Sequence, residues 1–188
     1  SLLRIILTPL FIILLFSESS SNRIFALIVF AVAAITDAYD GHLARKYNLI
    51  TPEGKFLDPL ADKILVLSAF FSFAFIGLID FWMVWIISFR DLFITGLRLI
   101  ISSKGFEFVT SNLSKYKTAF QLTIIILTLI FLTIEGFNID QLIPTLDLIK
   151  DYKIIYILTM FTAIFTAYTG IIYLYTNRIV IKDFINNS

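Results

Sequence analysis

Four aspartates are the residues of this sequence best suited to chemistry. Asp37 and Asp40 are three residues apart, and Asp58 and Asp62 are four residues apart. Each pair therefore shares one face if its segment is helical. Carboxylates inside apolar segments are costly unless they face a cavity and bind something. Oxygen ligands without cysteine favour a hard cation such as Mg²⁺ or Mn²⁺. Two such ions among four carboxylates suit phosphoryl transfer.

Small and basic residues extend the two acidic faces. Gly41 and Ala44 follow the first pair and leave room for a ligand to approach the helix backbone. Arg45 comes next, with a guanidinium that can pair with a phosphate. Gly54 lies one helical turn before Asp58 on the second face. The same two faces therefore offer both metal ligands and space for a phosphate-bearing ligand.

Apolar segments of membrane-spanning length must position these faces. Hydrophobic residues make up 59% of the 188 residues and there is no cysteine. A helix that crosses a bilayer needs about 20 largely apolar residues. Six segments approach that length, at 1–17, 23–46, 58–79, 82–102, 117–135 and 153–176. We expect an all-α integral membrane protein, a bundle of six transmembrane helices forming a single domain over residues 1–188. The chain starts inside an apolar run, so we also expect a truncated native N-terminus.

The distribution of Lys and Arg orients this bundle. If the segments alternate in direction, only Arg23, Lys150 and Lys153 fall toward one side, and most of the other basic residues fall toward the opposite side. Cytoplasmic loops carry the excess of Lys and Arg. Both termini and the 46–57 connection are therefore expected in the cytoplasm, which opens the four aspartates to that side. The net charge of +1 gives no sign of nucleic-acid binding.

The segment 37–62 resembles the signature of the CDP-alcohol phosphotransferase family. That signature reads Asp-x-x-Asp-Gly-x-x-Ala-Arg, eight further residues, then Gly-x-x-x-Asp-x-x-x-Asp, and each of its fixed positions is present here. The resemblance implies a six-helix membrane enzyme that acts as a homodimer. It also implies two divalent cations, Mg²⁺ or Mn²⁺, held by the four aspartates.

The resemblance further assigns a role to each residue of the signature. Asp37, Asp40 and Asp58 would be metal ligands, and Asp62 would be both a ligand and the general base that deprotonates the acceptor hydroxyl. The residues expected to hold the CDP part of CDP-diacylglycerol are Asp37, Gly41, Ala44, Arg45 and Gly54.

Segments beside the signature are similar to the bacterial phosphatidylglycerophosphate synthases within this family. They are FLDPLADK at 56–63, LARKYN at 43–48, RDLFITGLR at 90–98 and KYKTAFQ at 115–121. This similarity implies transfer of a phosphatidyl group to sn-glycerol 3-phosphate in the bacterial inner (cytoplasmic) membrane. An anionic acceptor needs cations near the metals. The candidates for binding its phosphate are Arg90, Arg98, Lys117 and Lys115.

Other interpretations of these residues remain open. Basic residues near membrane ends also set topology or contact lipid headgroups, and Arg90 could instead be neutralised by the neighbouring Asp91. The signature alone does not separate glycerol 3-phosphate from the acceptors of cardiolipin synthase, phosphatidylserine synthase or phosphatidylinositol-phosphate synthase. From a different class, an ion-coupled transporter would also place acids inside a helical bundle.

Overall fold

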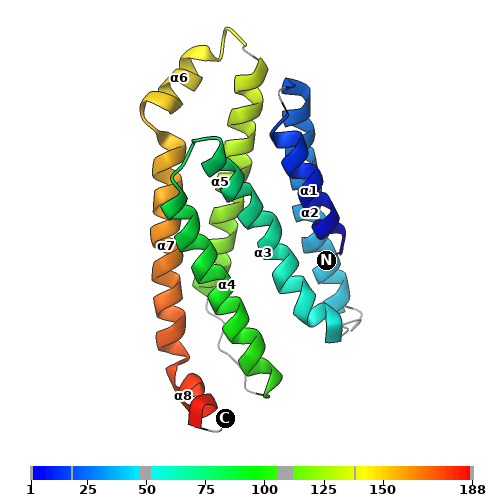
Figure 1. Cartoon of the computed structure of the whole chain (residues 1–188), viewed down its shortest axis with the longest axis vertical. Helices are drawn as coiled ribbons and strands as arrows, with labels where there is room; N and C mark the ends of the chain where they lie inside the picture. The colour runs from blue at the N-terminus through cyan, green and yellow to red at the C-terminus, as the bar shows by residue number, and fades with distance from the viewer. Residues whose placement is uncertain (1, 18, 47–51, 106–111, 138, 187–188) are drawn as a thin grey trace.

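The protein is helical throughout the part that the structure describes (Figure 1). The computed structural model describes residues 2–17, 19–46, 52–105, 112–137 and 139–186, and for residues 2, 37–46, 52–59, 62 and 112 only the backbone. The helices are α1 (Leu2–Leu15), α2 (Ser20–Lys46), α3 (Pro52–Phe75), α4 (Phe81–Ser103), α5 (Asn112–Phe137), α6 (Ile143–Asp151), α7 (Ile154–Thr176) and α8 (Arg178–Asn186).

The long helices match the segments expected from the sequence. α1 to α5 and α7 each cover one of the six apolar ranges. The short helices α6 and α8 were not expected, because nine residues are too few to show a membrane-spanning run. Among the described residues, Leu113–Phe137 and Ile154–Thr176 are long and apolar enough to cross a membrane.

Aromatic packing and polar contacts hold α2 between α1 and α5. The rings of Phe11 and Phe30 lie 5.5 Å apart between α1 and α2. At the beginning of α2, the Ser20 hydroxyl donates to the carbonyl of Gly136, and Arg23 Nη1 donates to the carbonyl of Leu132 at 3.1 Å. These bonds attach the upper end of α2 to the upper end of α5, as drawn in Figure 1.

A tight turn reverses the chain between α3 and α4. Gly77 has φ +85°, a left-handed conformation that glycine adopts without steric cost. The amide of Leu78 donates to the carbonyl of Phe73, and the amide of Gly77 donates to the carbonyl of Ala74. This pair of bonds satisfies the last carbonyls of α3. α4 therefore runs back beside α3 toward the lower end of the molecule (Figure 1).

One face of α7 carries buried threonines. The hydroxyls of Thr159 and Thr162 donate to carbonyls one turn earlier in the same helix, at 2.9 and 2.7 Å. Such bonds satisfy a hydroxyl where water is absent. Thr166 follows on the same face, and its hydroxyl is contacted by another helix. The interior of the bundle is therefore polar along this stripe, which prepares it to hold charged groups.

Large apolar side chains cover the outside. Phe75, Trp85 and Phe89 are 70%, 62% and 71% exposed, and Ile164 and Ile171 on α7 are 57% and 68% exposed. Exposed apolar area on this scale is unusual for a soluble monomer and marks contact with a membrane or a partner. Polar groups inside and apolar groups outside are the distribution that a lipid environment favours.

Candidate active site

The signature aspartates lie on the two helices that meet at the lower end of the molecule. Asp37 and Asp40 belong to the last part of α2, and Asp58 and Asp62 belong to the first part of α3. Figure 1 shows the end of α2 and the beginning of α3 together at that end. The two helices therefore bring the halves of the signature to the same end of the bundle.

The side chains of the signature lie outside the described residues. This holds for its acids and for the residues predicted to hold the CDP group, namely Asp37, Asp40, Gly41, Ala44, Arg45, Gly54, Asp58 and Asp62. Their roles therefore stay predictions.

The donor chemistry of these residues fits a divalent metal. Four carboxylates on two helices supply the oxygen ligands that Mg²⁺ and Mn²⁺ prefer. Within the described residues, no three or more His, Cys, Asp or Glu side chains come together as a competing site. The signature aspartates thus remain the predicted metal ligands.

A buried cluster of charged and polar side chains lies inside the bundle. Asp91, near the middle of α4, has a fully buried side chain. Its Oδ1 accepts from Lys117 Nζ of α5 at 2.5 Å and from Arg90 Nη1 at 3.1 Å. One carboxylate thus lies between two cations, which leaves one net positive charge. Buried ions of this kind are tolerated only when they are paired.

A glutamine and a threonine complete this group. Gln121 Nε2 donates to Asp91 Oδ2 at 3.3 Å and lies 3.4 Å from the hydroxyl oxygen of Thr166 on α7. Lys117 and Gln121 are four residues apart and share one face of α5. We call Arg90, Asp91, Lys117, Gln121 and Thr166 the Asp91 cluster. It joins α4, α5 and α7.

Helices α4 and α5, which carry most of the Asp91 cluster, pack against α3, the helix that carries the second half of the signature. Lys63, the residue that follows Asp62 on α3, is near enough for its charge to act on both Asp91 and Lys117. α3 therefore carries the end of the signature and borders the cluster.

Arg90 keeps one edge of its guanidinium without a partner. Among the described residues, its buried Nε and Nη2 atoms have no hydrogen-bond acceptor, while Nη1 is used by Asp91. Nε and Nη2 form the edge that binds two oxygens of a phosphate or carboxylate in parallel. A buried donor without an acceptor costs free energy, so these two atoms stand out among the described polar groups.

The structure brings two of the four predicted phosphate-binding residues together. Arg90 and Lys117 meet at Asp91, whereas Arg98 and Lys115 are exposed. Arg98 lies eight residues after Arg90, about 12 Å further along α4. Tyr173 of α7 is near enough to feel the charges of both Arg90 and Arg98.

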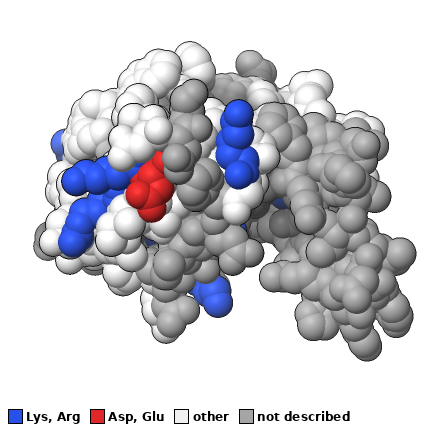
Figure 2. Space-filling model, turned by 90° about the horizontal axis from the view of Figure 1, so that it is seen from below, with Lys and Arg blue, Asp and Glu red and all other residues white. Residues whose placement is uncertain are grey.

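Basic side chains reach the surface at this end. Figure 2 views the molecule from below, and Lys and Arg are prominent among the described residues of this face. Arg98 and Lys115 belong to the helix ends found here, the end of α4 and the beginning of α5. They are exposed and do not belong to the Asp91 cluster.

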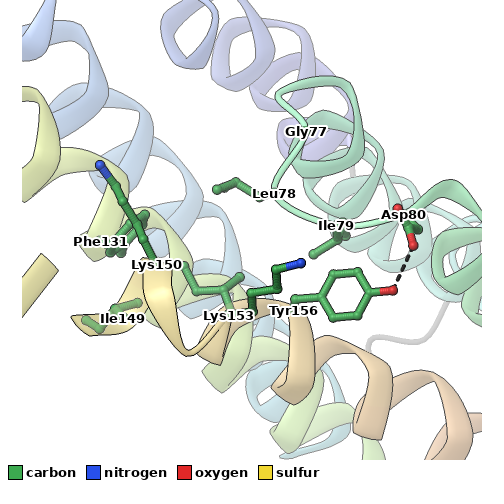
Figure 3. A pocket seen from close by; sticks show the side chains of 10 residues that line it. Gly77, Leu78, Ile79, Asp80, Phe131, Ile149, Lys150, Lys153 and Tyr156 are labelled. Atoms are coloured by element: carbon green, nitrogen blue, oxygen red, sulfur yellow. Dashed lines mark hydrogen bonds between the residues drawn. The ribbon is translucent and has the colours of Figure 1, made fainter. Parts of the chain in front are cut away.

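A cavity of about 310 Å³ lies at the opposite end of the bundle (Figure 3). The α3–α4 turn, α6 and the beginning of α7 line it, and Tyr156 closes one side by donating to Asp80 Oδ2 at 2.7 Å. α3 has 24 residues and is about 36 Å long, so the cavity is remote from the signature at its other end. Lys150 at the rim is already paired with Glu135 at 2.7 Å.

Sequence reasoning missed part of the cluster. The sequence indicates Asp91 only as a possible partner of the neighbouring Arg90, and it does not single out Gln121 or Thr166. The available signal was the pairing of Lys117 and Gln121 on one face of an otherwise apolar helix. That pattern indicates a polar face, but it does not show which helix the face contacts.

Comparisons with known proteins agree with the family resemblance of the sequence. The sequence profile described as CDP-alcohol phosphatidyltransferase matches residues 1–172. The chain belongs to the CDP-alcohol phosphatidyltransferase family. It is a membrane protein, as its apolar helices and its relatives indicate. The family as a whole depends on divalent metals, which suits the carboxylates of the signature.

Three curated relatives illustrate the similarity. A probable phosphatidylglycerophosphate synthase of Mycobacterium tuberculosis (strain CDC 1551 / Oshkosh) is 40% identical over 108 residues, which cover 56% of this chain and 52% of the relative. A CDP-diacylglycerol–glycerol-3-phosphate 3-phosphatidyltransferase of Bacillus subtilis is 38% identical, over 63% of this chain and 67% of the relative. A relative of the same name from Rickettsia bellii is 34% identical over 88% of this chain and 87% of the relative. The chain thus spans about half the length of the mycobacterial relative and most of the rickettsial one.

Proposed function

We propose that this protein transfers the phosphatidyl group of CDP-diacylglycerol to sn-glycerol 3-phosphate, yielding phosphatidylglycerophosphate and CMP. The observation that carries the proposal is the complete family signature on α2 and α3, beside a buried cluster with one surplus positive charge. The names of the relatives give the same donor and acceptor.

The donor would bind along the two faces of the signature. Gly41, Ala44 and Gly54 leave space for the CDP group, and Arg45 neutralises part of its charge. Asp37, together with the other three aspartates, would hold two divalent cations, which supply charge neutralisation for the pyrophosphate and for the departing CMP.

The acceptor hydroxyl is the nucleophile. Asp62 accepts the proton of this hydroxyl, and the oxygen of the acceptor forms a bond to the phosphorus that carries diacylglycerol. The bond from that phosphorus to the bridging oxygen breaks, and CMP leaves with the bonding electrons. The transfer needs no covalent enzyme intermediate, so its rate depends on holding the two substrates in line.

The phosphate of the acceptor would bind at the Asp91 cluster. Arg90 offers two parallel N–H donors on its unpaired edge, and Lys117 adds positive charge from the other side of Asp91. Arg98 and Lys115 would attract the anion to this end of the bundle. A serine acceptor has no phosphate to use such a pocket, and this favours glycerol 3-phosphate.

The same proposal includes the placement in the membrane. The six long helices cross the bacterial inner membrane, with the signature open to the cytoplasm, where the soluble acceptor is available. The chain forms one catalytic domain and acts as a homodimer, as the family resemblance implies. The acyl chains of the donor stay in the bilayer during the reaction.

The first test is an acceptor assay on the purified protein with CDP-diacylglycerol and Mg²⁺ or Mn²⁺. We expect CMP release that depends on glycerol 3-phosphate and stops when a chelator removes the metal. Asp62→Asn should lower kcat by at least about a hundredfold, as expected for loss of a general base, while CDP-diacylglycerol still binds.

Three other results would contradict the proposed acceptor, the proposed base or the proposed class of protein. CMP release that requires serine, inositol phosphate or phosphatidylglycerol would contradict the acceptor and keep the family chemistry. Near-normal turnover by Asp62→Asn would contradict the assignment of the base. Cation flux in reconstituted vesicles without any CMP release would favour a transporter.

A further inference from the structure

The side chain of Arg90 lies against a glycine of α7. A Cβ atom built on Gly170 would be 2.8 Å from Arg90 Cγ and 3.3 Å from Arg90 Nε. Real Cβ atoms essentially never approach a carbon as closely as the first of these distances. Gly170 is itself buried, so α7 offers no free space on that side. Arg90 can therefore occupy its position only because residue 170 has no side chain.

The guanidinium of Arg90 has one partner among the described residues. Asp91 Oδ1 accepts from Nη1 on one side of Arg90. Nε and Nη2 both lack an acceptor among the described residues. Gly170 lies against the base of the side chain, at Cγ, Cδ and Nε, so a methyl group on residue 170 would overlap Cγ and push the whole side chain away from α7.

We infer that Gly170 is a positioning residue for acceptor recognition: it lets Arg90 lie along α7 so that the Nε–Nη2 edge can bind the phosphate of a phosphate monoester. Asp91 orients the guanidinium from the opposite side. This inference rests on the proposed function, because it takes the acceptor phosphate as the ligand of Arg90. Gly170 touches no substrate in this scheme and acts only through Arg90.

Gly96 supplies a matched control. It lies in α4, on the same helix as Arg90, and a Cβ atom there would meet nothing within 4 Å. Gly96→Ala and Gly170→Ala therefore make the same chemical change in a helix interior, with the same gain in helix propensity. Only the second change places the new methyl group against Arg90.

The experiment measures CMP release while glycerol 3-phosphate and CDP-diacylglycerol are varied separately. Gly170→Ala should raise the KM for glycerol 3-phosphate about tenfold, the loss expected for one hydrogen bond to a charged group. Its kcat and its KM for CDP-diacylglycerol should stay within about twofold of the wild type. Gly96→Ala should keep all three values. A general loss of structure would instead lower kcat, whichever of the two substrates is varied.

A double-mutant cycle tests whether Gly170 acts through Arg90. Arg90→Ala removes Cγ, Cδ and Nε, the atoms that a methyl group on residue 170 would meet. Adding Gly170→Ala to Arg90→Ala should therefore change neither the KM for glycerol 3-phosphate nor the melting temperature, whereas independent sites would give additive effects. If Gly170→Ala alone does not fold, recovery of the melting temperature in the double variant still supports the contact.

Two outcomes separate this inference from the proposed function. A wild-type protein that does not use glycerol 3-phosphate would refute the proposed function, whatever the variants do. A wild-type protein that does use it, with Gly170→Ala kinetically equal to Gly96→Ala, would refute the role of Gly170 and leave the function intact. An additive double-mutant cycle would likewise overturn the inference.

Discussion

At the scale of single residues, the balance of charge around Asp91 determines what the interior of the bundle can bind. Arg90 and Lys117 share one carboxylate oxygen, and Gln121 occupies the other oxygen. Two cations against one anion would be unstable in an apolar interior without further compensation. The surplus charge is useful if a phosphate provides that compensation when the acceptor binds.

Asp91→Asn should strongly destabilise the protein. The substitution leaves Arg90 and Lys117 buried without a carboxylate, and loss of one partner of a buried ion pair costs about 3–5 kcal/mol. Thermal unfolding of the detergent-solubilised protein should show a clearly lower melting temperature. The control is Asp147→Asn on the exposed surface of α6, which should change stability by less than about 0.5 kcal/mol. Equal melting temperatures for the two variants would contradict the importance of the Asp91 pairings.

At the scale of elements, the α3–α4 turn sets α4 beside α3. The turn returns the chain within a few residues, so the helix that carries Arg90 and Asp91 packs against the helix that carries the second half of the signature. Asp80 strengthens the turn by accepting from Tyr156 at 2.7 Å and from Trp82 at 3.2 Å. The turn is thereby attached to α7 as well as to α4.

Gly77→Ala should weaken this turn. The residue has φ +85° and open space around it, so the cost comes from backbone strain rather than from a clash. Holding a side chain in the left-handed region costs about 1–2 kcal/mol. Gly77→Asn should cost less than Gly77→Ala, because asparagine tolerates this conformation better. Unfolding measurements that rank alanine as no worse than asparagine would contradict the strain argument.

At the scale of the whole molecule, the two ends of the bundle differ in chemistry. The lower end in Figure 1 holds the signature and the approach to the Asp91 cluster, while the upper end holds α6 and the cavity of Figure 3. Around that cavity Lys150 is paired with Glu135, and Asp80 accepts from Tyr156 and Trp82. The described charged groups there differ from the Asp91 cluster, in which two cations share one carboxylate.

Cysteine labelling can test the proposed orientation directly. The chain has no cysteine of its own, so Ser103→Cys at the end of α4 and Thr145→Cys on α6 each create a single reactive site. In inverted inner-membrane vesicles, a membrane-impermeant maleimide should label Cys at 103 and leave Cys at 145 unlabelled. Intact spheroplasts should give the reverse pattern. Labelling of position 145 from the cytoplasmic side would contradict the orientation.

The acidic signature and the long helices could be predicted from the sequence because both depend on local spacing. Residues three and four apart share a helical face whatever surrounds the helix, so the grouping of Asp37 with Asp40 and of Asp58 with Asp62 needs no tertiary information. Apolar length similarly indicates a membrane helix. α6 and α8 were not predicted, because a segment of nine residues is too short to show a clear helical spacing or a membrane-spanning apolar run.

The Asp91 cluster and the contact of Gly170 with Arg90 required the tertiary structure. Arg90, Lys117, Gln121 and Gly170 come from three helices, and their contacts depend on how each helix is rotated and how closely it packs. Local patterns do not specify that rotation, since the polar face of a helix can meet any neighbour that satisfies it. The sequence alone therefore defines the acidic residues and the chemistry they favour. Only the packing of α4 against α7, together with the contact of Lys117 with Asp91, shows which atoms of Arg90 lack an acceptor among the described residues.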